Sequence, residues 1–107
     1  MEGKFIHSVF FWLNNPGSAE DRKNFRASLQ RFIDNSEYIK SVHIGTPAGT
    51  PREVVDNSWT YNLIVEFDSK EDHDKYQEED VHKVFVAESH ELWARVQVYD
   101  SIVDEVE

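Results

Sequence analysis

The stretch FIHSVFFWL, residues 5–13, is apolar on both faces of the strand that it predicts. One alternating set of side chains comprises Phe5, His7, Val9, Phe11 and Leu13, and the other comprises Ile6, Ser8, Phe10 and Trp12. A strand that is apolar on both sides needs cover on both faces of its sheet. The turn-forming sequence NNPG, residues 14–17, ends the strand.

The remaining segments predict the element order β-α-β-β-α-β around this first strand. After the opening strand come a helix capped by Ser18 and ending near 35–36, a short strand at 38–44, a loop at 45–58, a strand at 59–67, two helical pieces from Ser69 to Trp93, and a strand at 94–102. This order is typical of a ferredoxin-like α+β fold with a four-stranded antiparallel sheet, whose first and third strands are central. The loop at 45–58 is longer than most connections, and such loops are often functional or mobile.

Apolar side chains alternate clearly along the third strand, and the two faces that they define indicate how the chain assembles. Its first face carries Trp59, Tyr61, Leu63, Val65 and Phe67. The helices of this fold cover only one face of the sheet, so the second face, with Ile6, Phe10, Trp12 and Ile64, needs another partner. The simplest partner is a second copy of the chain, which predicts a homodimer packed sheet to sheet about a two-fold axis.

Composition limits the classes of function. The chain has 107 residues, no cysteine and a formal net charge of -10, so disulfides and thiolate chemistry are excluded and neither nucleic acid nor an anionic membrane is an expected partner. We expect one domain over residues 1–103 and an acidic tail over 104–107. The start carries no signal-peptide pattern, which predicts a cytoplasmic protein. We interpret the acidic segment 66–80 as a solvated face. Whether it binds a divalent cation stays open.

Two groups of polar side chains are candidates for catalytic acid and base groups. His7 lies in the otherwise apolar first face of the opening strand, and Tyr61 lies on the matching face of the third strand. Tyr76 and His82 flank the joint between the two helical pieces. A neutral imidazole beside a phenol can act as base and acid in a dry pocket. The simpler interpretation, that His7 and Tyr61 are satisfied core residues, remains open.

Four parts of the chain together resemble the Dabb family, the stress-responsive A/B barrel domain within the dimeric α+β barrel fold. They are residues 5–11, the strand from Trp59 leading to 67–69, the spacing from Tyr76 to His82, and the closing 99–100 pair. The resemblance implies a homodimer with face-to-face sheets. A few plant members, including a polyketide cyclase, perform cofactor-free proton chemistry with a tyrosine and a histidine matching Tyr76 and His82, and a first-strand histidine matching His7.

Two departures separate this chain from those plant enzymes. Tyr61 stands where the cyclase has a further histidine, and residues 79–82 read EDVH where HPxH is common. The acids at 78–80 would also discourage anionic substrates. We therefore do not carry the cyclase identity over to this chain.

Three hypotheses for function follow. The first is binding of a small apolar or aromatic molecule in a cavity between helices and sheet, lined by Tyr61, Phe85, Trp93 and Phe11. The second is a cofactor-free lyase, isomerase or cyclase with His82 as base, Tyr76 as oxyanion donor and His7 as helper. The third is a monooxygenase-like activity in which His82 or His90 could ligate heme.

No metal or cofactor is expected from the sequence itself. His82 and His90 are eight residues apart, which is not the usual i, i+4 ligand spacing on a helix, although the five histidines could still converge in space. There is no phosphate-binding glycine loop and no serine nucleophile elbow.

Overall fold

The computed structural model describes residues 3–104 and contains one four-stranded antiparallel sheet over that range. Its strands are β1 (Phe5–Leu13), β2 (Ser41–Gly45), β3 (Tyr61–Phe67) and β4 (Trp93–Ile102), in the order β2-β3-β1-β4. The helices are α1 (Ala19–Asn35), α2 (Lys70–Glu78), α3 (Asp80–Ser89) and the short 3-10 helix η1 (His90–Leu92). The predicted ferredoxin-like α+β fold is confirmed, with β1 and β3 central.

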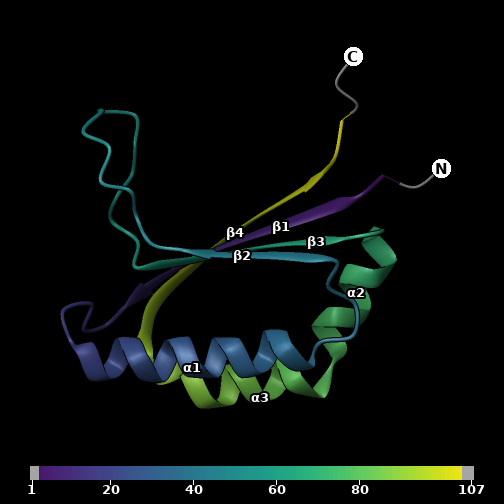
Figure 1. The fold of residues 1–107 in the computed structure, drawn as a ribbon, viewed down its shortest axis with the longest axis horizontal. Helices are drawn as coiled ribbons and strands as arrows, with labels where there is room; N and C mark the ends of the chain where they lie inside the picture. Colours follow the sequence, from purple (N-terminus) through teal and green to yellow (C-terminus); the bar gives the residue numbers. More distant parts are fainter. Residues whose placement is uncertain (1–2, 105–107) are drawn as a thin grey trace.

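Helices α1, α2 and α3 all lie on one side of the sheet (Figure 1). Two of them begin at the predicted serine caps, because the hydroxyl oxygen of Ser18 accepts from the backbone N–H of Asp21 and that of Ser69 from Asp72, both at 3.2 Å. Each cap satisfies a backbone donor that the first helical turn leaves without a partner. Helices α1 and α3 pack along each other, and α2 lies near one end of the sheet.

The core lies between the sheet and these helices. The alternating β1 side chains that face the helices are all buried: Phe5, His7, Val9, Phe11 and Leu13. Leu63 and Val65 of β3 lie opposite Val9 and His7 and extend the same layer. From α1, Phe25 and Leu29 are fully buried against it. The strict alternation of β1 therefore decides which side chains form the core.

The opposite face of the sheet has no helix over it in the described residues. Ile6, Phe10 and Trp12 of β1 are only half-buried there. Phe10 packs against Trp59 and Tyr99 with ring centroids 5.2 and 6.1 Å apart, and the Arg95 guanidinium lies 4.2 Å from the centre of the Trp12 ring. We call Phe10, Trp12, Trp59 and Tyr99 the outer aromatic cluster.

Three predicted boundaries need correction. Strand β2 begins at Ser41 rather than at residue 38, because the preceding residues connect α1 to the sheet. Strand β3 begins at Tyr61, and Trp59 packs on outer-face Phe10 instead of facing the helices, since its indole N–H is bonded to the loop carbonyl of Asp56. Trp93 opens β4 instead of ending the helix.

Between residues 3 and 104, none of the helices is both long enough and apolar enough to cross a bilayer. The predicted acidic tail at 104–107 falls mainly outside the described residues, which end with the exposed Asp104.

Candidate functional site

A cavity of about 170 Å³ lies between the sheet and helices α2 and α3. Its walls are mostly apolar: Val9, Phe11, Phe32, Leu63, Phe85, Val86, Trp93, Val96 and Val98. Four polar side chains also line it, namely His7, Tyr76, Gln77 and His82. An apolar pocket with a few convergent polar groups is the usual form of a small-molecule site.

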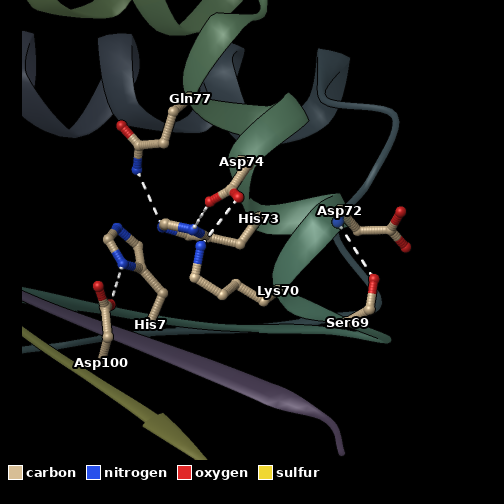
Figure 2. Close-up of polar contacts among 8 residues, drawn as sticks. All are labelled: His7, Ser69, Lys70, Asp72, His73, Asp74, Gln77 and Asp100. Carbon is tan, nitrogen blue, oxygen red and sulfur yellow. Dashed lines mark hydrogen bonds and ion pairs between the residues drawn. The ribbon is translucent and has the colours of Figure 1, made fainter. Parts of the chain in front are cut away.

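His7 enters the cavity from β1 and is oriented by Asp100 of β4. The strand register places the two residues opposite each other, and His7 Nδ1 lies 2.5 Å from Asp100 Oδ1 (Figure 2). Because a carboxylate only accepts, the Nδ1 of neutral His7 carries the hydrogen and its Nε2 is left as an acceptor. Burial lowers the pKa of His7 below its ordinary value, and the contact with Asp100 opposes that shift.

Tyr76 and His82 come from the two sides of the α2–α3 joint, and both line the cavity. Their rings pack edge to face with centroids 5.5 Å apart. Burial raises the pKa of the Tyr76 phenol far above its ordinary value, with the nearby Glu79 charge adding to the rise. Burial also lowers the pKa of His82. The phenol therefore stays protonated and the imidazole neutral at pH 7.

The α2–α3 joint is held by Glu79. Its carboxylate accepts a hydrogen bond of 2.5 Å from the Ser36 hydroxyl and one of 3.0 Å from the Glu37 backbone N–H, both just beyond the end of α1. Its backbone carbonyl accepts from the N–H of His82 at 3.1 Å. One side chain in the α2–α3 joint thus bonds to the end of α1.

The predicted site residues fall into two groups. His7, Tyr76 and His82 converge on the cavity, together with Phe11, Phe85 and Trp93.

Tyr61 is not among the described residues that line the cavity. Its ring stacks on Phe25 at 5.4 Å, under the Arg22 guanidinium at 5.0 Å. The reason is the register, because Tyr61 pairs with Phe11 near the end of the sheet that lies away from His7.

Sequence reasoning missed His73, Gln77 and Asp100. His73 lies one helical turn before Tyr76 on α2, and its ring stacks on Phe5 at 4.3 Å and approaches the His7 ring at 4.8 Å. The i, i+3 spacing from Tyr76 was a usable signal for His73. Asp100 continues the period-two pattern of Val96 and Val98, which was the available signal for its face of β4.

The remaining histidines lie elsewhere. His43 on β2 and His90 in η1 are exposed and outside the cavity lining of the described residues. His90 Nδ1 lies 3.2 Å from the backbone carbonyl of Val86. Of the two heme ligands considered from the sequence, only His82 therefore faces the cavity.

A four-stranded antiparallel sheet with helices on one face and a cavity between them defines a ferredoxin-like α+β protein. The sequence pattern of the stress responsive A/B barrel (Dabb) domain matches residues 5–103, and the chain belongs to this family. No curated protein sequence matches the chain.

Solved structures share the fold at low sequence identity. A hydroxynitrile lyase from Passiflora edulis is 18% identical with a TM-score of 0.83, covering 100% of this chain and 99% of its own. A dimeric ferredoxin-like protein of unknown function from Thermobifida fusca is 13% identical with a TM-score of 0.78, covering 96% and 93%. A putative antibiotic biosynthesis monooxygenase from Nitrosomonas europaea is 10% identical with a TM-score of 0.69, covering 96% and 93%.

Proposed function

We propose that this Dabb protein binds a small apolar or aromatic molecule carrying one polar group, in the cavity between the sheet and helices α2 and α3. The observation that carries this proposal is that two polar side chains lining the cavity lack hydrogen-bond partners in the part of the chain that the structure describes. Among the described residues neither the Tyr76 hydroxyl nor the His82 ring has a hydrogen-bond partner, although both line an apolar cavity. These polar atoms are not sealed inside the protein, because among residues 3–104 the fully buried side-chain atoms without a partner comprise Asn62 Oδ1 alone, so a ligand oxygen in the cavity would supply the missing hydrogen bonds.

The volume of the cavity limits the size of the ligand. A dry cavity of about 150 Å³ accommodates a benzene molecule in an engineered protein. The cavity of about 170 Å³ therefore suits a single ring or a short branched chain. A heme macrocycle is much larger than this space, so the cavity gives no specific support to the monooxygenase-like alternative.

A paired substitution on α3 tests this proposal. Val86 lines the cavity, whereas Val84, two residues earlier and also exposed, does not. We expect Val86→Phe to fill the mouth and weaken binding of a phenol or benzaldehyde probe at least about tenfold, which corresponds to about 1.4 kcal/mol. Calorimetric titration is the measurement, with native mass spectrometry of the purified protein to detect any ligand that copurifies.

Val84→Phe is the matched control and should bind the probes as the wild-type protein does. Equal affinities in the wild type and in Val86→Phe would show that the probes bind elsewhere and would contradict the proposal.

A second candidate function is cofactor-free proton transfer on the bound molecule. The specific observation is that a neutral imidazole at His82 and a protonated phenol at Tyr76 share one cavity, with His7 held by Asp100 beside them. His82 would accept a proton from a carbon or hydroxyl next to a carbonyl, and Tyr76 would donate a hydrogen bond to the oxygen that becomes negative. Such steps occur in lyases, isomerases and cyclases.

The test of this second candidate is turnover of small aldehydes, ketones or cyanohydrins. Activity should fall at least about a hundredfold in His82→Ala, as is typical when a general base is removed. It should persist in His90→Ala, because His90 lies outside the cavity. An equal loss in both variants would indicate destabilisation of the fold.

The assembly that we infer is a homodimer that covers the outer aromatic cluster. Four large aromatic rings gather on the face without helices, and the Asn62 side-chain oxygen on that face is buried without a hydrogen-bond partner in the described part of the chain. The Thermobifida fusca protein of the same fold is described as dimeric. A second copy packed sheet to sheet would bury these rings.

A further inference from the structure

We propose that His7, His73 and Asp100 form a binding site for one first-row divalent metal ion such as Zn²⁺. One ligand atom from each of these side chains lies within 4.8 Å of the others. The three residues come from three separate elements, β1, α2 and β4, so their convergence is a property of the tertiary fold (Figure 2). This site goes beyond the proposed ligand binding and does not depend on it.

The distances are close to those that a bound ion requires. Bonds from Zn²⁺ to nitrogen and oxygen ligands are about 2.0–2.2 Å, so donors that share one ion lie about 4 Å apart or less. Side-chain movements of about 1 Å or less would bring the three donors within this range. The ion would take the place of the hydrogen between His7 Nδ1 and Asp100 Oδ1, which are 2.5 Å apart. These two atoms would separate to about 3.3 Å to hold the ion, and the displaced proton would be released to solvent.

The surroundings of His73 are those of a metal ligand. Its Nδ1 lies 3.2 Å from Asp74 Oδ1, and the other oxygen of Asp74 accepts a 3.0 Å hydrogen bond from Lys70 (Figure 2). This chain of contacts places the hydrogen on Nδ1 and leaves Nε2 as an acceptor, 3.3 Å from the amide nitrogen of Gln77. Metal-binding histidines almost always donate their other ring N–H to a carboxylate, carbonyl or water in this way.

The ligand set decides which ions fit. Two imidazoles and one carboxylate suit zinc and its first-row neighbours, whereas Mg²⁺ and Ca²⁺ prefer oxygen ligands throughout. Three protein ligands leave at least one coordination position open. Because His7 and Gln77 also line the cavity, that open position would lie beside the space proposed for the small molecule.

The experiment measures Co²⁺ and Zn²⁺ binding to the full chain after treatment with EDTA. Co²⁺ is followed by its visible absorption and Zn²⁺ by calorimetric titration. The wild type should bind one ion per chain, and His73→Ala and Asp100→Asn should each weaken binding at least about tenfold. His43→Ala and His90→Ala remove exposed histidines outside the cluster and should bind as the wild type does.

Two further measurements separate the outcomes. Circular dichroism checks that each variant is folded, and His73→Gln provides a second, larger replacement if His73→Ala is not. Wild-type affinity in both His73→Ala and Asp100→Asn, or the absence of saturable Co²⁺ binding to the wild type, would overturn the metal site. Probe binding in EDTA-treated protein is measured separately, so failure here leaves the test with Val86→Phe unaffected.

Discussion

His82 shows at the scale of one residue how burial prepares a side chain for chemistry. Its imidazole packs against the Tyr76 and Phe32 rings, with centroids 5.5 and 5.3 Å away. Burial is the largest cause of its lowered pKa, and the nearby His7 adds to the effect. A neutral imidazole can accept a hydrogen bond or a proton, whereas a charged one can only donate.

The same shift predicts how stability depends on pH. The unfolded chain takes up a proton at His82 near the ordinary pKa of 6.5, whereas the folded chain takes it up only at lower pH. The unfolded state therefore binds more protons in this window, and the free energy of unfolding should fall as the pH drops below about 6.5. We expect the urea midpoint to be lower at pH 5.5 than at pH 7.5.

Two variants assign this effect to His82. In His82→Gln the fall in midpoint between the two pH values should be smaller, and the remaining fall includes the contribution of His7, whose pKa is lowered as well. His90→Gln should behave as the wild type. A fall as large in His82→Gln as in the wild type would contradict the assignment.

At the scale of elements, the α2–α3 joint determines how Tyr76 and His82 meet. Helix α2 ends at Glu78 and α3 begins at Asp80, so the backbone turns at Glu79. The contacts of Glu79 with Ser36 and Glu37 tie this turn to the end of α1. Three elements are thus connected through one carboxylate, and the positions of both cavity groups depend on it.

Replacing that carboxylate should loosen the joint. Glu79→Ala removes the acceptor for two hydrogen bonds, and we expect it to lower the free energy of unfolding by about 1–3 kcal/mol. Urea denaturation is the measurement, and probe affinity should fall as well because His82 is then less well positioned.

Glu78→Ala is the control for this effect. Glu78 is the preceding acid and is exposed, so its removal should change stability by about 0.5 kcal/mol or less. Equal effects of the two variants would show that the charge of the segment matters and the contacts of Glu79 do not.

At the scale of the whole molecule, the two faces of the sheet have different surroundings. The helix side holds the buried core and the cavity, whereas the other side carries the outer aromatic cluster with Tyr99 63% exposed. Such an apolar patch on one face is typical of an interface. Assembly would leave the cavity on the helix side of each copy.

A charge on the outer face should separate the proposed dimer. Tyr99→Glu places a carboxylate at a position that is exposed in the single chain, so the fold should persist. Burying that charge between two sheets costs several kcal/mol, and we expect the dimer to dissociate at least about a hundredfold more readily. Sedimentation velocity at micromolar concentration measures the change.

The comparison variant is Val42→Glu. Val42 is also exposed, at 45%, but it lies on the helix side of edge strand β2, so this variant should sediment as the wild type does. A monomeric wild-type protein, or dimers that persist in Tyr99→Glu, would contradict the sheet-to-sheet assembly.

The sequence by itself determined the element order, both serine caps and the two faces of β1, because these depend on local spacing and on alternation with a period of two. It also placed Tyr76 and His82 at one joint. Only the tertiary structure decided that Asp100 lies against His7, that His73 completes their cluster, and that Tyr61 lies away from the cavity. These outcomes depend on strand register and helix packing, which join residues as distant as 7 and 100, and no local pattern specifies such pairings.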